Sequence, residues 1–310
     1  MGRKSAPRQN GFTLIELTVV LALIGVISSA IGLTLVRQQR FYRSASELLY
    51  ARSDVRDAID VLATDIRGMA VADTVRVLAD SAIEMFATIG SSVVCQRQDT
   101  IEIGLSAGVS PRGNTLTSLL TQPDTGDLVL FYRDSVETGS HWERHRISGF
   151  RSTSSDTSCP VGSAFGLSGA AASGKGFVVT LTDALSSELG PGAPVRFVRR
   201  GRYSLYRASD GEWYLGYRRC NAVGASVCGP IQPLSGPYRA HSTNPQMTGL
   251  RFEYFDAGGS RLEAGASPLL LARVGITARA ESRARLAIEG RPLTPADSGT
   301  VSIAVRNRTP

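Results

Sequence analysis

Residues 12–36 read FTLIELTVVLALIGVISSAIGLTLV, an apolar run that contains a single charged side chain, Glu16. At ~1.5 Å per residue, a helix of this length exceeds the ~30 Å hydrocarbon core of a bilayer. The run therefore predicts one membrane-spanning helix. A cleaved secretory signal is the alternative, because Ser28, Ser29 and Ala30 imitate a small-residue cleavage site, but the apolar run continues past them.

The charges around this run do not orient it. Three basic residues stand on each side: Arg3, Lys4 and Arg8 before it, and Arg37, Arg40 and Arg43 after it. The whole chain has 34 basic and 27 acidic residues, a formal charge of +7. Removing the basic start leaves 31 minus 27, or +4. This surplus is too small to predict a specific nucleic-acid partner.

Glu16 is the unusual residue of the run. An ionised carboxylate at membrane depth is costly, so such a group usually has a partner. The alternative is a lone acid near a helix end that reaches the interface.

The stretch G-F-T-L-I-E-L, residues 11–17, follows a short basic leader. It resembles the cleavage and methylation motif of type IV prepilins and type II secretion pseudopilins. The resemblance implies that a prepilin peptidase cuts after Gly11 and methylates the new amino terminus of Phe12. It also implies a cytoplasmic leader, a helix stored in the bacterial inner membrane and a periplasmic head after residue 36.

Cleavage would also supply the partner that Glu16 lacks. An ammonium at Phe12 would lie four residues away on the same helix face, or it could pair with Glu16 of a neighbouring subunit. The resemblance implies the pair between neighbours, which sets axial register during filament assembly.

An apolar stripe continues the helix beyond the membrane. Its members recur at alternating spacings of four and three, with one miss at Arg52: Phe41, Ala45, Leu48, Val55, Ile59, Leu62, Ile66 and Met69. No proline occurs between Pro7 and Pro111, so the helix is expected to run from residue 12 to about residue 69, weakened only by Gly25 and Gly32. We expect the stripe to pack on the chain's own head rather than in a coiled coil.

Beyond Gly68 the pattern changes to short alternating runs separated by turn residues, which predicts an antiparallel, β-rich head and an α+β, pilin-like fold. The predicted strands are 82–87, 100–105, 127–133, 142–150, 177–181, 195–200, 203–208, 212–217, 250–255, 270–278 and 300–305. Hairpin turns are expected at Asp210-Gly211 and at Gly258-Gly259. Residues 106–125 and 152–175 are rich in small and polar residues and are expected to be loops. The two hairpins and LLLARVGITARAES, residues 269–282, resemble J-class minor pseudopilins and W-class minor pilins.

The four cysteines suit two disulfides in an oxidising compartment. Cys220 and Cys228 bracket a short loop that closes readily, so we pair them first, and Cys95 with Cys159 follows by elimination. Unpaired buried thiols are the alternative, since connectivity cannot be read from sequence.

Three other stretches could suggest chemistry. GAAASGKG, residues 169–176, comes close to a phosphate-binding loop, but it lacks the Ser or Thr hydroxyl and precedes a predicted strand. HWERH, residues 141–145, has the wrong position for the acid of a zinc motif, so a solvent-exposed hairpin is expected. Two loop pairs could attract calcium, Asp124 with Asp127 and Asp256 with Glu263, although turn capping is the commoner use of such residues. No metal, cofactor or catalytic residue is predicted.

The resulting prediction is a non-enzymatic minor pseudopilin of a type II secretion system, with a minor pilin of a type IV pilus as the alternative. A membrane-anchored periplasmic binding protein or hydrolase is the third hypothesis. The expected parts are a leader (1–11), the membrane half of the helix (12–36), its amphipathic half (37–70) and the head (71–310). The expected partners are the prepilin peptidase, major and minor pilin or pseudopilin subunits, and the inner-membrane assembly platform.

Overall fold

The computed structural model describes residues 13–69, 77–105, 116–134, 139–154, 158–159, 175–221, 227–263, 266–282, 286–288, 291–294 and 296–305. Its elements before the centre of the chain are α1 (Leu14–Gly68), β1 (Val77–Leu78), β2 (Ala82–Arg97), β3 (Glu102–Leu105), β4 (Ser118–Leu119), β5 (Leu128–Arg133), β6 (His141–Ser154) and β7 (Lys175–Leu181). The later elements are β8 (Pro194–Arg207), β9 (Trp213–Arg219), β10 (Gln232–Tyr238), β11 (Leu250–Phe255), the short 3-10 helix η3 (Pro268–Leu270), β12 (Arg273–Glu281), β13 (Leu286–Ile288), β14 (Arg291–Leu293) and β15 (Ala296–Ala304).

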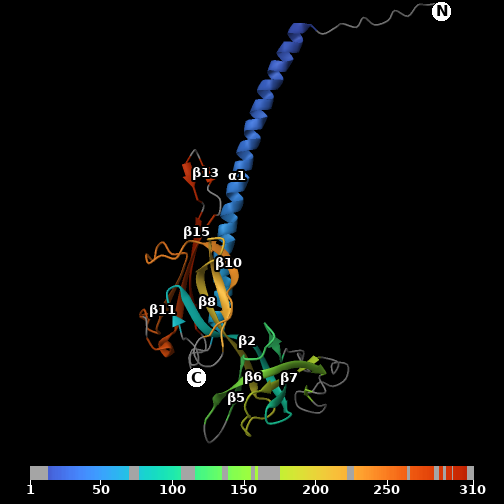
Figure 1. Ribbon diagram of the computed structural model, residues 1–310, viewed down its shortest axis with the longest axis vertical. Coiled ribbons are helices and arrows are strands. Elements are labelled where there is room, and N and C mark those ends of the chain that lie inside the picture. Colours follow the sequence, from blue (N-terminus) through green and yellow to red (C-terminus); the bar gives the residue numbers. More distant parts are fainter. Residues whose placement is uncertain are drawn as a thin grey trace, which may run out of the picture. The chain divides into compact units, whose positions relative to one another are not determined.

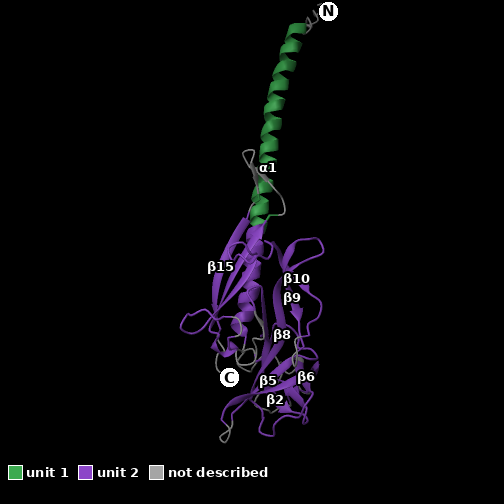
Figure 2. Cartoon of the chain, turned by 60° about the vertical axis from the view of Figure 1, so that its left-hand side comes forward, with its two compact units in different colours: residues 1–50, 282–295 green, residues 51–281, 296–310 purple. Residues whose placement is uncertain are grey.

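The chain forms two compact units (Figure 2). The first unit contains residues 1–50 and 282–295, and the second contains residues 51–281 and 296–310. In the first unit, α1 is exposed from Leu14 to Arg43, and the β13–β14 hairpin pairs Leu286 with Leu293.

In the second unit, the carboxyl-terminal part of α1 packs on the head through one stripe. Its buried residues are Ala51, Val55, Ala58, Leu62, Ala63 and Ile66, and Met69 after the helix is also buried. The sequence pattern has a polar residue, Arg52, where an apolar one is expected. The buried residue at this level is Ala51, because the stripe shifts by one residue there. Packing on the chain's own head is thus confirmed from residue 51 onward, whereas Phe41 and Leu48 are exposed.

The strands of the head form a thirteen-stranded antiparallel sheet in the order β1-β2-β3-β7-β6-β5-β8-β9-β10-β12-β11, with β15 on β12 and β4 on β2. Figure 1 shows β8, β10, β11 and β15 beside the lower part of α1, and β5, β6 and β7 toward the far end of β2. The predicted α+β fold, a long amino-terminal helix packed on an antiparallel β-rich head, is confirmed.

Strands β2 and β8 pair with each other and belong to both halves of this sheet. Their register runs from Ala82 opposite Ser204 to Val93 opposite Pro194. Beyond that pairing, β2 continues to β3, while residues 195–198 of β8 pair with β5 on the edge opposite β2. The pairings β3–β7, β7–β6 and β6–β5 close a circuit of strands. A second hydrophobic cluster fills this circuit, with Phe131, Ile147, Val179 and Phe197 among its members.

Buried tyrosines join α1 and neighbouring loops to the sheet. The hydroxyl of Tyr203 on β8 donates to the carboxylate of Asp65 on α1. The hydroxyl of Tyr238 donates to the carbonyl oxygen of Asp54, at 2.6 Å, and that of Tyr254 to the carbonyl oxygen of Ala79, at 2.9 Å. Burial raises the pKa of Asp65 and of the Tyr203 hydroxyl.

The strand predictions differ from the structure at several points. Strands β1, β13 and β14 were not predicted, and β2 continues to Arg97, past the predicted 82–87. The separate strands predicted at 195–200 and 203–208 are one strand, β8, which continues through Gly201. The glycine marks close packing rather than a break, since a Cβ there would overlap the ring of Tyr217. Strand β10 was not predicted, and β4 lies inside the expected loop 106–125, of which residues 106–115 are outside the described residues.

Both predicted turns reverse the chain. Gly211 has φ +90° between β8 and β9, whose register places Arg207 opposite Trp213. Gly259 has φ +86° after β11, but that turn returns only as a single bridge between Phe255 and Arg261. Strand β11 takes its full register from β12 instead.

Candidate functional site: the amino-terminal processing segment

Helix α1 begins with a reciprocal cap formed by Thr13 and Glu16. The Glu16 backbone N–H donates to Thr13 Oγ1 at 3.3 Å, and Glu16 Oε2 accepts from the Thr13 N–H at 3.0 Å and from its hydroxyl at 2.9 Å. This capping box satisfies two of the amide groups that a helix start leaves unpaired. The sequence signal T-x-x-E could have identified it, although Thr13 had not been singled out.

The other Glu16 carboxylate oxygen, Oε1, has no hydrogen-bond partner among the described residues. A carboxylate can accept several hydrogen bonds, so one oxygen caps the helix while the other is available. The two residues predicted to be processed, Gly11 and Phe12, lie outside the described residues.

The helix after this cap is long and apolar enough to cross a membrane, with a mean hydropathy of 2.6 over its best 18-residue window. Every residue from 13 to 43 is exposed in the structure, and a Cβ at Gly25 or Gly32 would meet no atom within 4 Å. The large apolar side chains of this segment therefore have no protein cover within the described part of the chain.

Two disulfides are present in the head, Cys95–Cys159 and Cys220–Cys228. These are the pairs named from the sequence. Next to Cys159, the buried Ser158 packs against two glycines, Gly104 on β3 and Gly176 on β7, where a Cβ would overlap Ser158 atoms. Gly176 thus serves close strand packing, and it was the last residue of the phosphate-loop-like stretch, whose residues 169–174 are outside the described residues.

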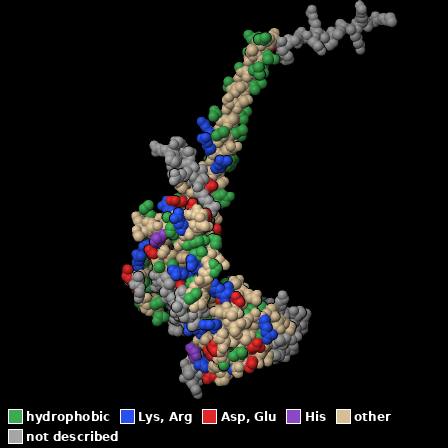
Figure 3. Space-filling view, in the orientation of Figure 1, with side chains coloured by type: hydrophobic (Ala, Val, Ile, Leu, Met, Phe, Trp, Pro, Cys, Tyr) green, Lys and Arg blue, Asp and Glu red, His purple; other side chains and the backbone are tan. Residues whose placement is uncertain are grey.

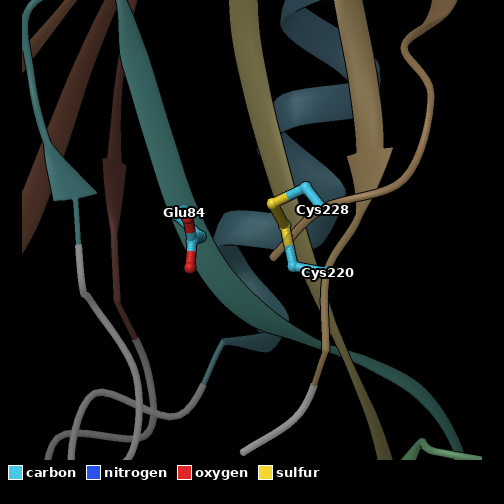
Figure 4. Close-up of side chains that lie close together, drawn as sticks. All are labelled: Glu84, Cys220 and Cys228. Carbon is cyan, nitrogen blue, oxygen red and sulfur yellow. A yellow bond between two sulfur atoms is a disulfide. The ribbon is translucent and has the colours of Figure 1, made fainter. Parts of the chain in front are cut away.

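A group of potential metal ligands lies beside the second disulfide. Glu84, Cys220 and Cys228 place one ligand atom each within 4.8 Å of one another (Figure 4). The two sulfur atoms are bonded to each other, so they provide no thiolate. The Glu84 carboxylate pairs with Arg200, with Nε and Nη2 at 2.7 and 2.5 Å from Oε1. The arrangement is that of a buried ion pair beside a disulfide.

Three of the four loop acids considered for calcium pair with arginines or cap a turn. Arg199 Nη2 lies 2.7 Å from Asp127 Oδ2, and Arg219 bridges Asp124 and Asp127 at 2.8 and 3.0 Å. The hydrogen bond from Arg219 is the main cause that lowers the pKa of Asp124. Asp256 caps its turn by accepting the Ser260 N–H at 2.8 Å.

The expectation of a solvent-exposed HWERH stretch is wrong for His145, which is buried on β6. Its Nδ1 and Nε2 lie 2.8 Å from carboxylate oxygens of Asp183 and Glu143, respectively. His141 instead contacts Arg133 Nη2 at 2.9 Å. Among the described residues, these side chains do not form a metal-binding group. They attach the segment after β7 to the β5–β6 hairpin.

Comparison with known proteins agrees with the site at the amino terminus. Residues 6–32 match the family described as the prokaryotic N-terminal methylation motif. No curated protein and no solved structure matched the chain. With this motif followed by one long apolar helix on an antiparallel β-rich head, the chain fits a type IV prepilin-like protein.

Proposed function

We propose that the chain is a minor pseudopilin or pilin subunit that is stored in the inner membrane and then assembled into an extracytoplasmic filament. The observation that carries this proposal is the methylation motif at residues 6–32, which includes the exposed apolar start of the long helix α1. A prepilin peptidase would cut after Gly11 and methylate Phe12. The leader would be cytoplasmic, and the head would lie in the periplasm, where disulfides form.

Glu16 would set the axial register between neighbouring subunits during assembly. One of its oxygens caps its own helix through Thr13, and Oε1 has no partner among the described residues. The methylated ammonium of Phe12 in a neighbouring subunit would be a charge-assisted donor for that oxygen. A pair of this kind would hold two apolar helices at one axial offset while it neutralises both charges.

We assign the chain to the minor subunits because the proposed head, residues 71–310, is bulky for a repeating filament shaft. A position at or near the filament tip would leave room for it and would let it help initiate assembly. Its partners there would be other minor and major subunits and the inner-membrane assembly platform. We propose a structural, non-catalytic role, which the methylation motif supports.

The first candidate machine is a type II secretion system, and a type IV pilus for adhesion, motility or DNA uptake is the alternative. A deletion strain complemented with the wild-type chain distinguishes the two machines. Complementation with Glu16→Ala tests the register role. Loss of secreted protein in the deletion strain, restored by the wild type, identifies the secretion machine, and loss of motility or DNA uptake identifies the pilus. Normal filament incorporation of Glu16→Ala would contradict the register role.

A further inference from the structure

Three arginines follow the apolar segment of α1 immediately. At ~1.5 Å per residue, residues 14–36 extend about 35 Å, and the next seven residues, to Arg43, add about 10 Å. The polar headgroup layer adds roughly 5–7 Å on each side of the hydrocarbon core. Arg37 and Arg40 therefore fall at headgroup depth when Val36 lies at the edge of the hydrocarbon core. Arg43 lies just beyond this layer, and its long side chain reaches back to it because helical side chains point toward the amino terminus of the helix.

These arginines have no acidic neighbour along the helix within the described residues 17–46. No acidic residue occurs between Glu16 and Glu47, and Glu47 Oε2 accepts a hydrogen bond of 2.6 Å from Ser282 Oγ. Within the described part of the chain, the three guanidinium groups are exposed and form no ion pair or side-chain hydrogen bond. Their three-residue spacing places them within an arc of about 120° on one side of the helix. Basic side chains are visible on α1 in Figure 3.

Two aromatic rings stand at the same level on another side of the helix. Phe41 and Tyr42 are 69% and 67% exposed, and their ring centroids lie 6.0 Å apart in an edge-to-face arrangement. Aromatic rings are enriched at the membrane interface, where their apolar bodies leave water. This exposed ring pair indicates that the helix contacts lipid at the level of Arg40, rather than an acidic surface of another protein.

We infer that Arg37, Arg40 and Arg43, flanked by Phe41 and Tyr42, form a collar that binds the headgroups of anionic phospholipids. A guanidinium donates two parallel hydrogen bonds to a phosphodiester, which an ammonium cannot do. Net-anionic headgroups are preferred because a zwitterionic headgroup carries its own cation beside the phosphate. This inference rests on the membrane span in the proposed function, but not on leader processing or filament assembly.

Native mass spectrometry of the full chain from mixed micelles tests this collar. The micelles contain phosphatidylglycerol or phosphatidylcholine with the same acyl chains, and the retained lipids are counted. A gain of about fivefold per arginine near the surface predicts a roughly 100-fold preference for phosphatidylglycerol at low salt. Arg37→Gln/Arg40→Gln/Arg43→Gln should lose it. The matched control, Arg56→Gln/Arg67→Gln/Arg146→Gln, removes the same charge from exposed sites elsewhere and should keep it.

Equal retention of the two lipids by the wild type would overturn the inference, and so would an equal loss in both triple variants. If the wild type shows no lipid preference but the first triple variant no longer co-purifies with other subunits, the arginines serve a protein contact instead. Leader removal is measured on the same preparations. An uncut leader with an intact lipid preference would contradict the proposed function and leave the collar standing.

Discussion

Glu84 on β2 and Arg200 on β8 form an ion pair inside the head, with 0% and 1% of their side chains exposed. The two residues stand 116 positions apart in the chain, and the guanidinium also donates to the carbonyl oxygen of Asn221 at 2.9 Å. The pair therefore joins β2 and β8 to the start of the Cys220–Cys228 loop.

Removing one partner of this pair should destabilise the head strongly. Glu84→Gln leaves a buried guanidinium without its carboxylate, and such losses cost about 3–5 kcal/mol. Glu84→Leu combined with Arg200→Met removes both charges and should recover most of that loss. Denaturant unfolding of the full chain in detergent, followed by near-ultraviolet circular dichroism, measures both. A double variant as unstable as Glu84→Gln would show that the loss of stability does not come from the unpaired charge of Arg200.

The packing of Ser158 against β3 predicts an effect of a single methyl group. Gly104→Ala would place a Cβ against the Ser158 carbonyl oxygen, which has little room to move because Cys159 is held by its disulfide. We expect a loss of about 1–3 kcal/mol in the free energy of unfolding. Gly190→Ala is the control, since a Cβ there meets no atom within 4 Å, and it should change stability by less than about 0.5 kcal/mol. Equal effects would show that Ser158 does not pack as described.

The two disulfides should differ in their contribution to stability. Cys95 and Cys159 are 64 residues apart, whereas Cys220 and Cys228 are 8 residues apart. Loop-closure entropy predicts about 4 kcal/mol for the longer loop and about 2.5 kcal/mol for the shorter one. Cys95→Ser/Cys159→Ser should therefore lower the unfolding midpoint more than Cys220→Ser/Cys228→Ser. Peptide mapping without reduction checks the pairing itself, and a Cys95–Cys220 peptide would refute it.

The buried tyrosines predict a loss of stability in alkali. Burial raises the pKa of Tyr203, Tyr238 and Tyr254 above the ordinary value of about 10. The folded chain then keeps protons that the unfolded chain releases, so this stability is fully present below about pH 10 and falls as the pH rises above it. Tyr203→Phe should make the fall shallower, whereas Tyr42→Phe, at an exposed ring, should not. An unfolding midpoint that stays constant from about pH 9 to pH 11 would contradict this linkage.

Local patterns in the sequence were sufficient for the parts of the fold that depend on neighbouring residues. The apolar run, the absence of proline and the stripe predicted a helix that ends within one residue of Gly68, and alternation predicted strand 250–255 as β11. Asp210-Gly211 predicted its hairpin because a positive φ at Gly211 suits that turn.

Features that depend on distant residues were missed. Strand β10 contains Pro233 and Pro237 and shows no clean alternation, so its pairing with β9 and β12 makes it a strand. The burial of His145 depends on Asp183, 38 residues later, and no local pattern signals it. The capping box of Thr13 and Glu16, in contrast, follows a local T-x-x-E pattern and is predictable from the sequence.

The central claim is that the amino terminus is a processed prepilin segment, and the mass of the amino-terminal peptide tests it most directly. The full chain is expressed with and without a prepilin peptidase, and Gly11→Leu serves as the uncut control. The account predicts a mature chain that begins at Phe12 and carries one methyl group on its amino nitrogen, only with the peptidase and only with Gly11. A chain that still begins in the leader, or is cut after Ala30, would contradict it.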